Sequence, residues 1–178
     1  MVADIDGVMT PEQRFTRIFD AHHDAVRAYA WRRDQAVADD VVAETFLVAW
    51  RKLDRVPDDE LPWLLAVARN VRLNMARASR RRRHHEARLA PPGPQPSFVG
   101  AVHERLALSS ALASLSEVDR EILLLAAWED LDRPAIARVV GCSTAAVAVR
   151  LFRARRRLER ALQALDRPFP TEELRDAS

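Results

Sequence analysis

Apolar residues recur along most of the chain at steps of three and four, which is the spacing of one face of an α-helix. Such stripes run over residues 15–30, 42–53 and 64–75, and they predict three helices that pack together. Pro57, amid the acids of residues 58–60, predicts a polar loop between the second and third helices. Strand-like alternation is nearly absent, so the pattern predicts an all-α protein.

The periodicity fades from about residue 79, where a basic run is followed by four prolines and a glycine. This composition predicts a linker that is flexible overall and stiffer where the prolines dominate. Apolar spacing resumes at Leu106 and continues to Ala126. We therefore expect two small helical domains, residues 14–83 and 106–165, joined by a linker at 84–105.

Composition narrows the class of protein further. The chain has 178 residues, 48% of them hydrophobic and 30% charged, which is globular composition. No apolar run approaches the roughly 20 residues of a membrane span, and the N-terminus does not resemble a secretory signal, so we expect a cytoplasmic protein without membrane insertion. The single cysteine, Cys142, excludes an intramolecular disulfide and a multi-thiolate zinc site. We expect it to be a small buried residue in a turn, and we expect neither a metal nor a cofactor.

Charge is unevenly distributed along the chain. Residues 34–60 hold eight acids against three bases, whereas residues 77–88 and 143–160 each hold six arginines and one acid. Such segregation indicates that different faces meet partners of opposite sign.

Residues 131–158 have the pattern of a helix-turn-helix. Asp132 can cap a short helix that begins with Pro134, Gly141 can end it in the left-handed conformation, and Ser143 can cap the next helix. The residues expected to face inward are Ile136, Ala137, Val140, Val147, Leu151, Ala154 and Leu158. The arginines expected to face outward, towards phosphates and guanine edges, are Arg150, Arg153, Arg155, Arg156 and Arg157.

The segment LSEVDREILLLAAWEDLDRPAIARVVGCSTAAVAVRLFRARRRLERAL resembles the C-terminal domain of extracytoplasmic-function sigma factors. The resemblance implies that the second helix of the motif reads the minus thirty-five promoter element in the major groove. Many members have Thr-Val-Lys/Arg-Ser where this chain has Ala-Val-Ala-Val at 146–149. The DNA-binding residues expected here are Ser143, Thr144, Ala148, Arg150, Phe152, Arg153, Arg156 and Arg157.

The segment DDVVAETFLVAWRKL, residues 39–53, is similar to the same family's docking helix for the coiled coil of the polymerase β′ subunit. Acids beside a tryptophan suit an interface with a basic helix pair. The residues expected to bind polymerase are Asp39, Asp40, Glu44, Phe46 and Trp50. An alternative remains in which Trp50 belongs to the core and the acids are merely solvated.

The segment PWLLAVARNVRLNMAR, residues 62–77, resembles the family's helix that recognises and melts the minus ten element. Trp63, Asn70 and Arg77 lie seven residues apart, so they share one helix face, which suits an unpaired strand. The preceding loop, 55–61, corresponds to the place where members capture a flipped base, and its acids suit contacts with amino groups. The residues expected at this site are Asp58, Trp63, Asn70, Asn74 and Arg77, unless Trp63 is core.

The resemblance implies three partners: core RNA polymerase, through the β′ coiled coil and the β flap, promoter DNA, and, by analogy, an anti-sigma factor. Two other classes of protein remain as alternatives. A helix-turn-helix repressor acting without polymerase would bind duplex DNA specifically by itself. A helical metal-dependent nuclease would need Asp39, Asp40 and Glu44 to converge with His84 or His85, and their spacing gives no ligand pattern.

Overall fold

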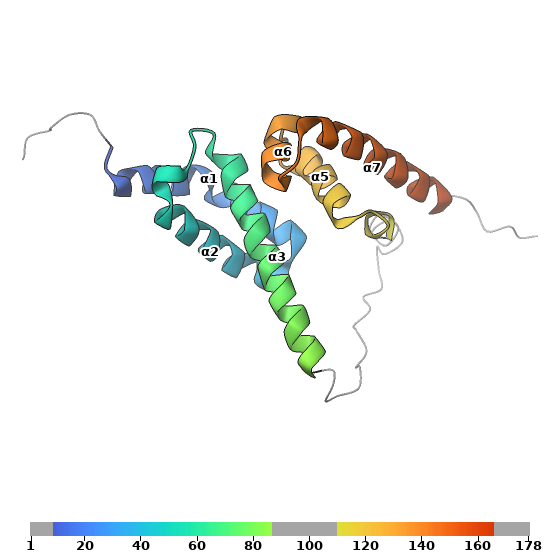
Figure 1. Cartoon of the computed structure of the whole chain (residues 1–178), viewed down its shortest axis with the longest axis horizontal. Coiled ribbons are helices and arrows are strands. Elements are labelled where there is room, and N and C mark those ends of the chain that lie inside the picture. Colours follow the sequence, from blue (N-terminus) through green and yellow to red (C-terminus); the bar gives the residue numbers. More distant parts are fainter. Residues whose placement is uncertain (1–8, 87–109, 166–178) are drawn as a thin grey trace, which may run out of the picture.

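The computed structural model describes residues 9–86 and 110–165, which form helices and no strand, so the all-α prediction is confirmed. Figure 1 shows two groups of helices. The first group contains α1 (Pro11–Arg33), α2 (Ala38–Arg51) and α3 (Glu60–Glu86), with short 3-10 turns at Gln35–Val37 and Leu53–Arg55. The second contains α5 (Glu117–Trp128), α6 (Arg133–Val140) and α7 (Thr144–Leu165).

The N-terminal domain is built from the three predicted stripes. A capping box begins α1, since the Thr10 hydroxyl accepts from the Gln13 backbone N–H and the Gln13 side chain accepts from the Thr10 backbone N–H. α1, α2 and α3 pack against one another. The buried side chains that join them include Ile18, Val26, Val42, Phe46, Ala49, Leu64 and Ala68.

α3 is longer than the sequence pattern suggests. It continues to Glu86, so the residues where the apolar periodicity fades are helical, as are residues 84–86, the first three of the expected linker. Arginine and alanine are good helix formers, and the prolines that break the pattern begin only at residue 91. The rest of the expected linker, together with Leu106 and Leu108, lies outside the described residues.

The C-terminal domain has α6 packed against both α5 and α7. The Ser116 hydroxyl caps α5 by accepting from the Asp119 backbone N–H at 3.1 Å. The core includes Leu115, Ile122, Leu125, Ile136, Ala137, Val147, Leu151 and Ala154. One expectation is wrong here: Val140 is only half-buried, while its neighbour Val139 is 3% exposed and belongs to the core.

The two domains touch. α3 lies against α6, and Asp59, just before α3, forms an ion pair with Arg138 of α6. Leu65 of α3 is fully buried and lies seven residues before Arg72, which pairs with α5, so both point towards the C-terminal domain. This contact fixes how the two domains are arranged in the structure.

Among the described residues, no single helix is long and apolar enough to cross a membrane. α6 and α7 reach the required length and hydropathy only as a pair, and that pair is bent by 97°.

Candidate functional site

α6 and α7 form the expected helix-turn-helix. The Asp132 carboxylate accepts from the Ala135 backbone N–H at 2.8 Å, and the Ser143 hydroxyl accepts from Ala146 at 3.2 Å. Gly141 ends α6 with φ 73°, in the left-handed region where residues with a side chain are strained. The two helices cross at 97°, within the range typical of this motif. Cys142 lies in the turn, as expected, but is only half-buried.

The outward face of α7 is basic with an apolar strip. Phe152 is 63% exposed, and the Arg156 guanidinium lies 5.9 Å from its ring centroid. A shallow groove of about 440 Å³ follows this face and is lined by Asp119, Ala145, Ala146, Val149, Arg150, Arg153 and Arg157. Ser143 and Thr144 are exposed at its beginning, and Ala148 is half-buried.

The outward arginines are not equivalent. Nη1 of Arg150 lies 3.0 Å from Oδ1 of Asp119 on α5, so its charge is already paired. Arg153 has no ion pair within the described residues, and neither do Arg156 and Arg157. The pairing of Arg150 was not foreseen, because Asp119 stands 31 residues earlier in the chain.

The exposed face of α2 combines acids with an exposed tryptophan. Asp39 and Asp40 are exposed, Glu44 is half-buried, and Trp50 is 43% exposed. Phe46, expected in the same interface, is only 4% exposed and therefore supports the face from beneath.

Aromatic rings of α1 brace this face from the side. The Phe15 ring lies edge-on to Trp50 at 5.2 Å and to Phe46 at 6.5 Å. Leu47, 41% exposed, adds an apolar neighbour that we did not anticipate. Leu47 stands three residues before Trp50, and this helical spacing could have placed it on the same face in advance.

The exposed face of α3 carries Asn70, Asn74 and Arg77, with Nη1 of Arg77 donating to Oδ1 of Asn74 at 3.2 Å. Trp63, expected on this face, is half-buried and packs against the core. The sequence allowed Trp63 to lie either on this exposed face or in the core, and in the structure it packs against the core. The polar face of α3 therefore consists mainly of two amides and one guanidinium.

The three acids around the start of α3, two in the preceding loop and one at its first residue, have different environments. Asp58 is exposed, Asp59 is paired with Arg138, and Glu60 is 5% exposed. Glu60 binds Arg17 and Nε2 of His22, the latter at 2.8 Å. Only Asp58 therefore remains available for a base, whereas we expected all three acids to be.

The pKa of Glu60 reflects this pairing. Burial by itself would raise the pKa, but the hydrogen bonds from His22 and Arg17 outweigh it, so the pKa lies below its ordinary value. The charged Glu60 side chain therefore joins α1 to α3 through its ion pairs and is not free to bind DNA.

Within the described residues, no group of three or more His, Cys, Asp and Glu side chains could hold a metal ion. Asp39, Asp40 and Glu44 lie on α2, and the side chains of His84 and His85 lie outside the described part of the chain.

Comparisons with known proteins agree with the architecture. Residues 18–82 match Sigma-70 region 2, and residues 105–158 match Sigma-70, region 4. The chain is 32% identical over 173 residues to the ECF RNA polymerase sigma factor SigL of Mycobacterium tuberculosis, covering 92% of this chain and 98% of SigL. It is 35% identical over 156 residues to the probable RNA polymerase sigma factor RfaY of Xanthomonas campestris, and this match spans 81% of this chain and 39% of RfaY.

A solved structure is similar over both domains. The sigma factor RpoE of Bartonella quintana, solved in complex with the anti-sigma factor NepR, matches with a TM-score of 0.65 and 25% identity, covering 86% of this chain and 98% of RpoE. These relatives give no support to the repressor alternative. With regions 2 and 4 both matched, in order and on the two domains described above, the chain belongs to the extracytoplasmic-function sigma factors of the sigma-70 family.

Proposed function

We propose that this sigma factor directs transcription initiation through three separate exposed faces, one on each of α2, α3 and α7. The α2 face would bind core RNA polymerase, the α3 face would bind the minus ten element, and the α7 face would read the minus thirty-five element. The observation that carries the proposal is that each face presents a chemistry suited to a different partner. The role requires binding and no reaction catalysed by this chain, and we infer a cytoplasmic location because core polymerase is there.

The α2 face fits a basic protein surface. Asp39 and Asp40 provide exposed negative charge in the first turn, and Trp50 and Leu47 provide exposed apolar area further along the helix. Charge complementarity speeds and orients association, whereas a partly exposed tryptophan contributes affinity once it is covered. The coiled coil of the polymerase β′ subunit is the partner that the family resemblance implies.

The α3 face fits an unpaired DNA strand. Amides such as Asn70 and Asn74 can bond the edges of separated bases, and Arg77 can bind the backbone. Asp58 stands at the N-terminal end of the same helix and can accept from a base amino group. Trp63 is half-buried, so only its exposed edge is available to contact a base.

The α7 face fits duplex DNA. Its arginines suit guanine edges and phosphates, and Phe152 and Val149 provide apolar contact of the kind that thymine methyl groups accept. The second helix of a helix-turn-helix enters the major groove in this way. Because the C-terminal domain would also contact the β flap, we infer that polymerase and DNA hold it together.

An anti-sigma factor is a further partner. The similar RpoE was solved in complex with the anti-sigma factor NepR, and by that likeness we infer a protein regulator for this chain as well.

Run-off transcription with purified core polymerase tests the proposed function. Adding this chain should produce transcripts from its cognate promoters, starting with the promoter of its own gene, whereas core polymerase alone should not. A gel shift on duplex DNA without polymerase provides the counter-test. Specific binding by the chain alone, with no polymerase-dependent transcript, would contradict the proposal and support a repressor.

A further inference from the structure

One arginine of α1 holds the joining segment between α2 and α3, residues 52–59, at two points. Nη1 of Arg14 donates to the Leu53 carbonyl at 2.9 Å, and Nη2 donates to the Val56 carbonyl at 2.6 Å. The guanidinium is half-buried, and its planar fork suits two acceptors at once. Leu53 and Val56 are 9% and 3% exposed, so their side chains pack in the core while α1 binds their carbonyls. The first half of the joining segment is thus fixed through both backbone and side chains.

Glu60 fixes the other end of the joining segment. It begins α3, is 5% exposed, and binds Arg17 and His22 of α1 as described above. Together with the two bonds of Arg14, these contacts join positions 38 to 43 residues apart. A single helix, α1, therefore binds the chain on both sides of residues 57–59.

Asp58 is the middle residue of this short stretch. Pro57 before it has a fixed φ, which removes further backbone freedom. Asp59 after it is paired with Arg138, whereas Asp58 is exposed and has no ion pair within residues 9–86 and 110–165. A short stretch held at both ends has few conformations available, so the fold presents the Asp58 carboxylate in a defined place.

Resting on the proposed function, we propose that Arg14 is a positioning residue for minus ten recognition, which holds the joining segment so that Asp58 meets the amino group of one unpaired base. Arg14 does not need to touch DNA, because its guanidinium binds the two carbonyls. A fixed carboxylate would be left unpaired against a base that lacks an amino group, whereas a mobile one could turn back to water. Discrimination at that base therefore depends on a residue of α1.

A purely structural role for Arg14 predicts a different result. Loss of two hydrogen bonds would then destabilise the N-terminal domain and weaken binding to every promoter alike. Loss of positioning would instead flatten the preference at one base, and only while Asp58 is present to read it. Base substitution and a double-mutant cycle can therefore separate the two roles.

Backbone amide relaxation, measured by NMR on the free full-length chain, tests whether Arg14 holds the segment. Arg14→Met keeps the alkyl stem and removes both donors, so the order parameter of the Asp58 amide should fall from about 0.85, typical of rigid backbone, towards about 0.6. Arg27→Met is the matched control, because Arg27 is exposed on the same helix and lies over the Trp31 ring, 5.9 Å from its centroid. The control should leave the Asp58 amide unchanged. An unchanged order parameter in Arg14→Met would overturn the proposal.

Arg14→Lys is a second variant for the case in which Arg14→Met does not fold. It keeps the positive charge and loses the planar fork that binds both carbonyls, so the Asp58 order parameter should fall in the same direction by a smaller amount. A value equal to that of the parent would again contradict holding by Arg14.

Promoter binding by reconstituted holoenzyme tests the consequence for base reading. Each position of the minus ten element is substituted in turn, and Asp58→Ala identifies the position that Asp58 reads. At that position Arg14→Met should reduce the preference about tenfold, near the lower end of what a hydrogen bond to a charged group contributes. The preferences at the other positions and at the minus thirty-five element should stay unchanged, as should all preferences of Arg27→Met. In the Asp58→Ala background, adding Arg14→Met should cause no further loss at the position that Asp58 reads.

The outcomes separate this proposal from the proposed function. If Arg14→Met weakens all templates alike, or reduces the preference further when Asp58 is already replaced, Arg14 has only a structural role and the proposal is overturned while the sigma role stands. If Asp58→Ala alters no base preference, the segment reads no base and the proposal is also overturned. If the unaltered chain directs no promoter-specific transcription with core polymerase, the proposed function fails and this proposal fails with it.

Discussion

Arg153→Ala should change which promoters the protein prefers, because Arg153 is the arginine of the α7 face best placed to read bases. It is exposed, lines the groove along α7, and has no ion pair within the described residues. Arg150, one turn earlier, lines the same groove but is bound to Asp119 at 3.0 Å. The two variants Arg153→Ala and Arg150→Ala therefore form a matched pair.

The magnitudes differ for a physical reason. A bidentate contact between arginine and guanine contributes about 1 to 3 kcal/mol of discrimination, which corresponds to roughly 5-fold to 150-fold between matched and substituted elements. The Arg150 and Asp119 side chains are 45% and 15% exposed, so their pair contributes only about 0.2 to 1 kcal/mol. Arg150 must give up that pair to bind DNA. We therefore expect a smaller loss of discrimination from Arg150→Ala than from Arg153→Ala.

The assay is promoter binding by reconstituted holoenzyme, measured over a salt series on wild-type and substituted upstream elements. It distinguishes arginines that read bases from arginines that position the helix on phosphates. Arg153→Ala should flatten the preference among templates. Arg156→Ala should weaken all templates alike and reduce the salt slope by about one unit, as expected for one lost phosphate contact. If Arg153→Ala lowers affinity equally on every template, the α7 helix is an electrostatic clamp. Promoter choice would then rest on the N-terminal domain.

Four further outcomes follow from the geometry. Trp50→Ala with Asp40→Arg should weaken pull-down of core polymerase while circular dichroism stays unchanged, and pull-down at wild-type strength would reject the α2 face. Asn70→Ala should spare holoenzyme assembly but reduce permanganate reactivity of promoter thymines; normal reactivity would remove Asn70 from the melting site. Gly141→Ala meets no atom within 4 Å, so its cost of about 1 kcal/mol should come from the left-handed backbone alone and appear as a lower melting temperature. Because the pKa of Glu60 lies below its ordinary 4.5, its stabilisation is complete above that pH and is lost as the pH falls towards the lowered pKa; Glu60→Gln should remove this acid dependence from the free energy of unfolding, and an unaltered acid profile would contradict this role of its ion pairs.

The helix-turn-helix could be predicted almost residue by residue because its signals are local. Asp132, Gly141 and Ser143 each act on backbone groups within three or four positions, and the inward stripe follows directly from helical periodicity. Val139 lies in the core where we expected Val140, and this difference shows the limit of that reasoning. In a helix of eight residues, a neighbouring helix decides which of two adjacent valines is covered.

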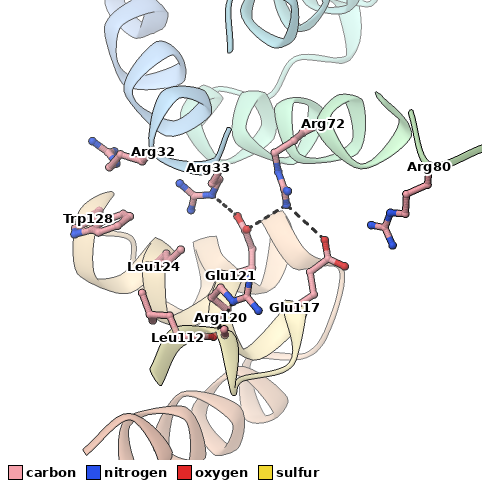
Figure 2. A pocket seen from close by; sticks show the side chains of 11 residues that line it. Arg32, Arg33, Arg72, Arg80, Leu112, Glu117, Arg120, Glu121, Leu124 and Trp128 are labelled. Carbon is pink, nitrogen blue, oxygen red and sulfur yellow. Dashed lines mark hydrogen bonds and ion pairs between the residues drawn. The ribbon is translucent and has the colours of Figure 1, made fainter. Parts of the chain in front are cut away.

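The ion pairs between the domains could not be predicted from the sequence. Figure 2 shows the buried Glu121 of α5 reaching towards Arg33 of α1 and Arg72 of α3. The hydrogen bonds that Glu121 and Glu129 of α5 accept from α1 join residues 88 to 97 positions apart, and charged residues give no periodic signal that pairs one helix with another. Glu121 lies on the same helix as Ile122 and Leu125, and its sequence context indicates a solvated position. The availability of Asp59 and Glu60 was overestimated for the same reason, since their partners lie on distant helices.

The buried Glu121 also limits how freely the two regions can be exchanged among relatives. A region 4 taken from another sigma factor would need a carboxylate at the position of Glu121 in α5. Without one, Arg33 and Arg72 would lose their shared ion-pair partner. Such a chimera should lose the ion pairs that Glu121 makes with the N-terminal domain, while the apolar contact between α3 and α6 could remain. Arg33 and Glu121, whose side chains are bonded at 3.0 Å, should therefore vary together among homologues.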